Sequence, residues 1–175
     1  RYFIRGVGNL QRLGLPIERF CDLVNTFANF SQFWGYTLTS EWFKHEYIAY
    51  SVHGIGHVTR VMFWVHILSY LVKADVLTGI TAQYAAFIHD LCRENQQEDH
   101  QHGVEAVRKF SNFLKRTQIP EHLIHSCSNA VIYHCKDDNE CTIQDLIWQL
   151  LKDADALDRG RVGNPQGVSS IRKRS

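Results

Sequence analysis

Apolar residues recur at helical spacing along nearly the whole chain, and no stretch gives a convincing strand or hairpin signal. The spacing predicts helices over residues 15–34, 39–50, 53–74, 78–92, 99–116, 120–135 and 142–159. No internal repeat or low-complexity tract interrupts this pattern. Because 175 residues suffice for a single domain with a sizeable core, we expect an all-α helical bundle with an N-terminal helical extension.

The composition gives no sign that the protein binds nucleic acid or a membrane. The formal net charge is +1, so the whole molecule offers no electrostatic signal for nucleic acid or for an anionic membrane. The longest strongly apolar stretch, residues 61–72, is too short to cross a bilayer. Five Cys without any C-x-x-C pair argue against a disulfide framework and a Cys-rich zinc site, and favour a reducing, cytoplasmic compartment.

The chain is unusually rich in histidine, with ten His residues but a single Met. His53 and His57 are four apart on a predicted helix, so they lie on nearly the same face. Such a pair can share a metal ion. Alternatively, one imidazole can bind the ion while the other acts in its outer coordination sphere. The alternative is a pair at a helix start that faces solvent.

The segment "AAFIHDLCREN" places His89 beside Asp90 where a buried helix gives way to turn residues. Adjacent residues on a helix point about 100° apart. Both side chains can therefore reach one ion only near a helix end, and the turn residues that follow predict such an end here.

Three carboxylates, Asp153, Asp155 and Asp158, end the last apolar helix in "LLKDADALDRGR". Asp155 and Asp158 are three apart and share a face, and small alanines flank Asp155. A buried carboxylate without a partner is costly, and a metal ion removes that cost. The alternatives are a solvated helix end, or a carboxylate paired with Arg159.

These signals occur in the order His, His-Asp, Asp, and the segments "HGIGHVTRV", "AAFIHDLCREN" and "KDADALDR" carry them. In this the chain resembles the HD-domain superfamily of metal-dependent phosphohydrolases over about residues 50–160. The resemblance implies an HD-domain-like helical bundle at 49–163, with a helical extension at 1–48 packed on it. We expect the tail at 164–175 to continue in a longer parent chain.

The resemblance also implies a ligand set. His57, His89, Asp90 and Asp155 match the metal ligands of the family. His53 is the alternative to His57 as the first ligand, and Asp153 is the alternative to Asp155 as the last. Imidazole and carboxylate ligands suit Mn²⁺, Fe²⁺, Ni²⁺ or Zn²⁺, with Mg²⁺ less favoured. The remaining candidates, for a second metal or for substrate, are His53, His102 and His134.

The implied function is hydrolysis of a nucleotide or another small phosphate ester by a metal-activated water. The catalytic candidates are Asp90, Arg93 and Lys136, and the phosphate-binding candidates are Arg93, Lys136 and Arg159, with Arg60 secondary. We expect one tightly held ion, because the sequence offers no bridging carboxylate apart from Asp90. The alternatives are a catalytically weak regulatory module that binds metal or nucleotide, and a di-iron oxygenase.

Overall fold

A computed structural model describes residues 21–22, 25, 37–97, 99–141 and 143–159. Its elements are η1 (Ser40–Trp42), α3 (Glu46–Ala49), α4 (Ile55–Leu71), α5 (Val76–Ile88), α6 (His102–Arg116), α7 (Glu121–Tyr133), η2 (Asp138–Glu140) and α8 (Leu146–Arg159). No strand occurs among the described residues, which confirms the predicted all-α class. Most of the predicted helix 15–34 and the whole tail 164–175 lie outside the described residues, and the predicted domain boundaries stay predictions.

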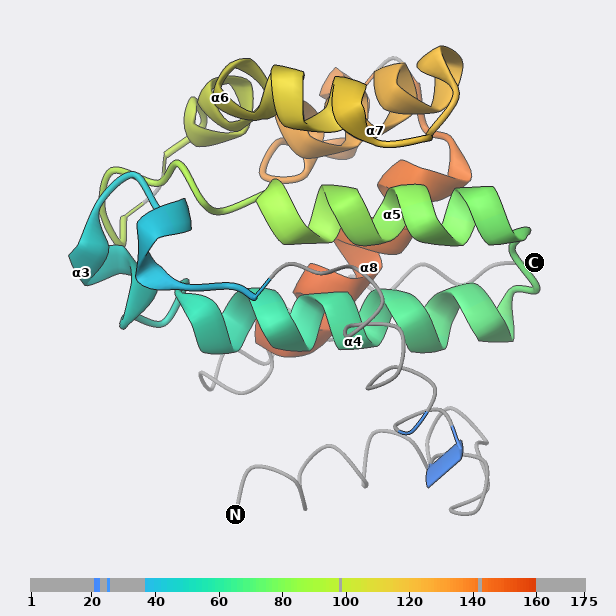
Figure 1. Ribbon diagram of the computed structural model, residues 1–175, viewed down its shortest axis with the longest axis horizontal. Coiled ribbons are helices and arrows are strands. Elements are labelled where there is room, and N and C mark those ends of the chain that lie inside the picture. Colours follow the sequence, from blue (N-terminus) through green and yellow to red (C-terminus); the bar gives the residue numbers. More distant parts are fainter. Residues whose placement is uncertain (1–20, 23–24, 26–36, 98, 142, 160–175) are drawn as a thin grey trace. The chain divides into compact units, whose positions relative to one another are not determined.

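The described residues from Leu38 onward belong to one compact unit. Helices α4 and α5 lie side by side, α8 packs across both, and α7 contacts α5, α6 and α8 (Figure 1). Trp148 of α8, Phe87 of α5 and Ile67 of α4 are among the largest buried side chains between these helices. The helix ends that carry the candidate ligands are thereby held on a packed core.

Aspartates at three loop ends explain where the helices begin. Asp75 accepts hydrogen bonds from the backbone N–H and hydroxyl of Thr78, so α5 begins two residues earlier than predicted. Asp99 accepts from the backbone N–H of His102, and α6 begins at His102 rather than at Asp99. Asp145 accepts from the backbone N–H of Trp148 in the first turn of α8.

The prediction of one helix over residues 39–50 is wrong. The segment forms the short η1 and the single turn α3, with Phe43 in an extended conformation between them. The backbone N–H of Lys44 donates to the carbonyl of Leu91 at 2.8 Å instead of to a helical carbonyl. This bond ties the segment to the turn that follows α5, which a continuous helix would not allow.

Gly54, which precedes α4, lies very close to the backbone of Ala49. A Cβ atom added there would lie 2.1 Å from the carbonyl oxygen of Ala49, so only glycine fits. The backbone therefore comes very close to this helix start at Gly54. At Gly56 the nearest neighbour of an added Cβ atom would instead be the flexible side chain of Arg60, at 3.1 Å.

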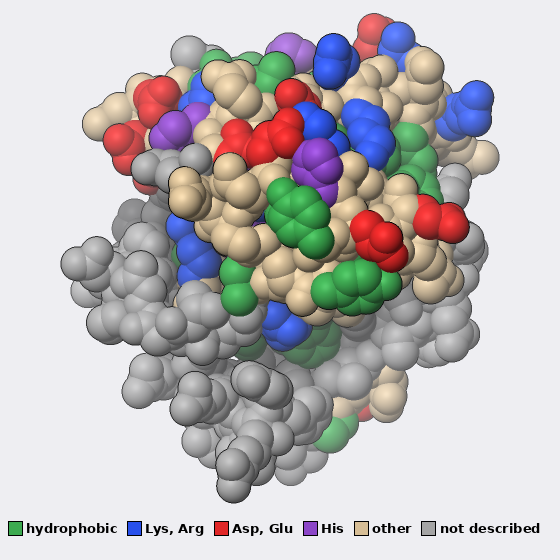
Figure 2. Space-filling view, turned by 90° about the vertical axis from the view of Figure 1, so that its left-hand side faces the viewer, with side chains coloured by type: hydrophobic (Ala, Val, Ile, Leu, Met, Phe, Trp, Pro, Cys, Tyr) green, Lys and Arg blue, Asp and Glu red, His purple; other side chains and the backbone are tan. Residues whose placement is uncertain are grey.

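Charged side chains and histidines gather on the face that carries α3 (Figure 2). Lys44 pairs there with Glu94 and Glu105, and His45 also pairs with Glu94. These exposed pairs contribute little stability individually, but they connect the turn after α5 with α6. None of the helices in the described part of the chain combines the length and apolar character that a bilayer crossing requires.

Candidate metal centre

The His89–Asp90 pair lies where α5 ends. His89 caps the helix, and its backbone N–H donates to Ala85 at 3.1 Å, while Asp90 lies in the turn beyond. Both are almost fully buried, with exposed fractions of 0% and 2%. The predicted change of direction is thus present, and the two adjacent side chains reach the same interior space.

His57 of α4 and His89 face each other through Nε2 atoms that are 3.2 Å apart. In each ring the Nδ1–H donates elsewhere: His57 to the carboxylate of Asp158 at 2.7 Å, and His89 to the carbonyl of Ala86 at 2.7 Å. In the neutral rings, both Nε2 atoms then carry lone pairs. Two lone pairs at this distance repel each other unless a proton or a metal cation lies between them.

Two carboxylates complete this group, which we call the first set: His57, His89, Asp90 and Asp155. The Nε2 atom of His57 lies 3.4 Å from Oδ2 of Asp90 and 3.3 Å from Oδ1 of Asp155. Metal–ligand bonds of about 2.1 Å put neighbouring ligand atoms about 3.0 Å apart in an octahedron and about 3.4 Å apart in a tetrahedron. The observed separations therefore fit ligands of one ion.

A second pair of imidazoles repeats the arrangement. The Nε2 atoms of His102 and His134 are 3.0 Å apart, and their Nδ1–H groups donate to the carbonyls of Asp99 and Val131 respectively. Both side chains are buried, with exposed fractions of 1% and 3%. Here too the two Nε2 atoms converge, so a proton or a metal cation can lie between them.

Asp90 lies between the two imidazole pairs. Its Oδ2 atom faces His57 and His89, the latter at 3.7 Å, whereas its Oδ1 atom lies 3.1 Å from His102 and 3.6 Å from His134. One carboxylate thus offers a separate oxygen to each side. Such a carboxylate can bridge two ions.

His53 contacts the same carboxylate from the outer edge of the cluster. Its Nδ1 atom lies 3.1 Å from Oδ2 of Asp90, and its side chain is a quarter exposed. The more buried His57, rather than His53, faces His89. This geometry favours His57 over its rival as the ligand and leaves His53 at the solvent side, as a candidate for contact with substrate.

The charges of the first set depend on one another. Burial lowers the pKa of His57, but its bonds to Asp155, Asp158 and Asp90 raise this pKa well above its ordinary value. Burial raises the pKa of Asp155, but His57 and Arg159 more than offset this and lower it. A proton held by His57 therefore occupies a position that a cation would take.

His89 and Asp90 have protonation states that suit metal binding. Burial lowers the pKa of His89 to about 3, which keeps the imidazole neutral. Burial raises the pKa of Asp90, yet the nearby His89, His102 and His134 hold it well below the usual range, so the carboxylate is charged. A neutral imidazole beside a charged carboxylate is the state in which both bind metal.

The other predicted acids and cations have different surroundings. Asp153 is buried but belongs to none of the groups of converging ligand atoms among the described residues. Arg60 pairs with Asp158, its Nε atom 2.6 Å from Oδ1. Arg159 lies 3.0 Å from Asp155, so a pairing weighed as an alternative to metal binding coexists with the cluster.

The guanidinium of Arg93 forms hydrogen bonds mainly with backbone carbonyls. It donates to the carbonyls of Gln97 at 2.6 Å and Asn95 at 3.3 Å, and one nitrogen lies 3.5 Å from Asp90. It therefore holds the turn after the His-Asp pair in place, and its part in phosphate binding stays a prediction. Lys136 lies over the ring of Tyr133, at 5.0 Å from the centroid, beside an open pocket.

Sequence reasoning missed two residues of the centre. Asp158 was noted for its position beside Asp155, but not as the acceptor that orients His57. Carboxylates that hold a ligating imidazole in this way set its tautomer and orientation. Cys135 was not considered, although it directly follows a candidate ligand and lies near His102 and His134.

Comparison of the chain with protein-family models, with curated proteins and with solved structures finds no match. The HD-domain resemblance therefore stays a prediction that rests on the three motifs. What the structure shows independently is a buried cluster of His and Asp side chains that can bind a metal ion.

Proposed function

We propose that this chain is a metal-dependent phosphohydrolase of the HD-domain type, which holds two divalent ions bridged by Asp90 and acts on a small phosphate ester. One observation carries the proposal: two pairs of imidazoles converge on opposite oxygens of a single buried carboxylate. The expectation of one tightly held ion rested on the lack of any bridging carboxylate other than Asp90. Because Asp90 offers a separate oxygen to each pair of imidazoles, we favour two ions.

Bound divalent ions would lower the pKa of a coordinated water and stabilise the charge that develops on a phosphoryl group. The chain's own residues fix the geometry for this chemistry. Asp158 keeps the proton of His57 on Nδ1, and Ala86 does the same for His89, so both rings present Nε2. Asp90 offers one oxygen to each set of imidazoles.

A pocket of about 610 Å³ adjoins the cluster and offers space for the body of a substrate. Its lining residues are His134, Cys135, Lys136, Asp137, Asp138, Asn139, Lys152, Asp153, Ala156 and Arg159. This volume is within the range of about 300–1,000 Å³ that small-molecule sites occupy. A smaller pocket, also lined by His134, Cys135 and Arg159, includes Asp90 and Asp155, so the larger pocket continues toward the cluster.

Polar groups dominate the larger pocket. Lys136, Lys152 and Arg159 contribute positive charge, and Asp137, Asp138 and Asp153 balance it. Such a lining suits a polar, phosphorylated molecule such as a nucleotide better than an apolar one. Lys136 and Arg159 remain our candidates for contact with phosphate oxygens.

The test is a metal assay followed by a hydrolysis screen. Purified protein loaded with Mn²⁺, Fe²⁺, Ni²⁺ or Zn²⁺ is assayed for phosphate release from a nucleotide panel, and for cleavage of a chromogenic phosphate diester. We expect two ions per chain and hydrolysis that disappears in Asp90→Ala while helical circular dichroism is kept. Asp75→Asn is the matched control, because Asn caps a helix as well as Asp and position 75 is exposed.

The same measurements distinguish the alternatives. Two bound ions without hydrolysis of any substrate would contradict the enzymatic proposal and favour the regulatory module. Iron as the retained metal, together with consumption of oxygen, would instead favour the di-iron oxygenase. Wild-type metal content and turnover in Asp90→Ala would show that the site has been misassigned.

A further inference from the structure

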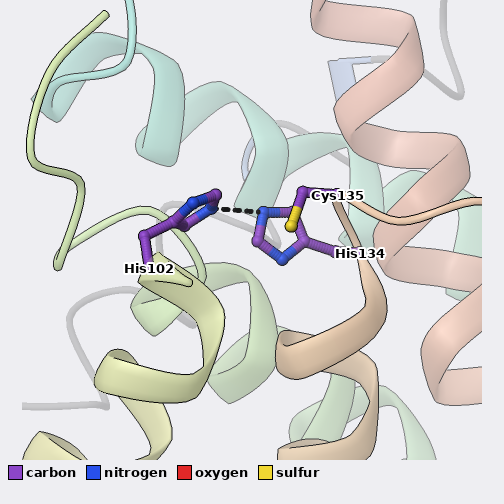
Figure 3. A group of neighbouring side chains, drawn as sticks. All are labelled: His102, His134 and Cys135. Carbon is purple, nitrogen blue, oxygen red and sulfur yellow. Dashed lines mark hydrogen bonds between the residues drawn. The ribbon is translucent and has the colours of Figure 1, made fainter. Parts of the chain in front are cut away.

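Cys135 lies at the junction between the cluster and the open pocket. It directly follows His134 at the end of α7, and it lines both the small pocket that includes Asp90 and the larger one. One nitrogen of His102, one of His134 and Sγ of Cys135 all lie within 4.8 Å of one another (Figure 3). A thiol is therefore available where the second pair of imidazoles converges.

The two imidazoles already present their ligating atoms at this point. Because backbone carbonyls accept from both Nδ1–H groups, the Nε2 atoms of His102 and His134 face each other at 3.0 Å. Oδ1 of Asp90 lies 3.1 Å from the first of them. These two nitrogens and one oxygen make three candidate ligand atoms. Cys135, which lines both pockets, offers a fourth.

The other cysteines of the same compact unit are placed differently. Sγ of Cys141 donates to the carbonyl of Ile143 at 3.2 Å. Cys127 is fully buried. Cys92 is also buried, and none of the groups of converging ligand atoms among the described residues includes it. Cys135 alone of the four combines partial exposure with two neighbouring imidazoles.

We propose that Cys135 is a thiolate ligand of the second ion, which His102, His134 and Oδ1 of Asp90 also bind. This inference rests on the proposed function only for the presence of that ion. On binding, the thiol proton passes to solvent and the sulfur lone pair bonds to the metal. Sulfur and imidazole ligands together select a thiophilic ion such as Zn²⁺, whereas the first set offers only nitrogen and oxygen. The two positions therefore differ in metal preference.

The experiment uses Co²⁺ as a spectroscopic probe of the full chain. Thiolate coordination gives an intense sulfur-to-cobalt charge-transfer band in the near ultraviolet, which nitrogen and oxygen ligands do not give. We expect the band in the wild type and in Cys21→Ser, whose cysteine is exposed, and its absence in Cys135→Ser. The visible bands of bound Co²⁺ should persist in Cys135→Ser, and its affinity for Zn²⁺ at the second position should fall by more than roughly tenfold.

A second measurement needs no variant at all. Iodoacetamide labelling of the wild type, read on the peptide that contains Cys135, should be suppressed by Zn²⁺ and restored by a chelator. Co²⁺-loaded wild type without the charge-transfer band, or labelling of Cys135 that Zn²⁺ leaves unchanged, would overturn the proposal. Failure to hydrolyse any phosphate ester would leave both readouts unaffected, so the assignment of Cys135 and the proposed activity fail separately.

Discussion

His57 is the residue on which most of the geometry depends. Its Nδ1–H donates to Asp158, and its Nε2 atom faces His89, Asp90 and Asp155. A ligand ring without such a partner can rotate and can carry its proton on the wrong nitrogen. The role of Asp158 follows from a contact between residues 101 positions apart, which the spacing of the motif does not reveal.

Substitution Asp158→Asn tests that role. We expect metal affinity at the first set to fall about 10- to 100-fold, because an amide neither attracts the Nδ1–H as strongly nor fixes the tautomer. Metal content after dialysis against a buffered chelator measures the effect. Asp75→Asn, at the end of α5 opposite to His89, should keep wild-type affinity, and equal affinities in the two variants would contradict the assignment.

Proton release should accompany metal binding. The pKa of His57 lies well above its ordinary value, so near neutral pH the ring carries a proton that an ion must displace. Affinity should therefore weaken as the pH falls below this raised pKa, by about tenfold per pH unit for each proton released. Calorimetric titration in buffers of different ionisation enthalpy counts these protons. An affinity that is constant between pH 6 and 8 would contradict the prediction.

Helices α6 and α7 bring His102 and His134 together through a close contact at one glycine. A Cβ atom added at Gly103 would lie 2.3 Å from the carbonyl oxygen of Val131, which is on the facing helix. The two helices can approach this closely only because residue 103 has no side chain. Since His102 adjoins Gly103, the separation of these helices also sets the separation of the two imidazoles.

Substitution Gly103→Ala should therefore affect the second ion more than the first. We expect overpacking to cost about 1–3 kcal/mol of stability and to move His102 away from His134. Metal analysis should show about one ion per chain. The control is Gly79→Ala in α5, where the added Cβ would meet Ser69 at an ordinary 3.7 Å and should raise stability by up to about 1 kcal/mol. Two tightly held ions in Gly103→Ala would refute the proposed dependence of the second ion on the close approach of α6 and α7.

At the scale of the molecule, the cluster joins α4, α8, the end of α5, the start of α6 and the end of α7. Candidate ligands from these five segments meet at Asp90 and His57. The folded chain arranges this site, whereas the unfolded chain scatters its ligands. Ions should therefore bind the folded state far more tightly and stabilise it.

Chelation should lower the thermal stability of the protein. An ion present at 100 times its dissociation constant adds about 2.7 kcal/mol to the free energy of unfolding. For a domain of this size, we expect a melting temperature several degrees lower after treatment with a chelator, restored by Zn²⁺ or Mn²⁺. Differential scanning calorimetry measures the shift. Identical melting curves with and without the chelator would argue that the cluster binds no ion.

The sequence by itself determined the helical class and the candidate ligands. Helical periodicity is a local property, so the pattern predicted the six later segments as helical, apart from the break at Phe43 and shifts of a few residues at the capping aspartates. The His-Asp pair and the carboxylates of α8 were evident from residue type and spacing. A local pattern also suffices to expect a helix end beside His89.

Only the tertiary structure showed that the buried imidazoles form two pairs on either side of Asp90. His102 and His134 are 32 residues apart, and their convergence depends on the close packing of α6 and α7 at Gly103. Whether an acid of α8 binds metal or orients His57 depends on its position opposite α4. The placement of Cys135 beside two imidazoles also arises from long-range packing, because side-chain convergence is a property of the assembled helices and of no segment alone.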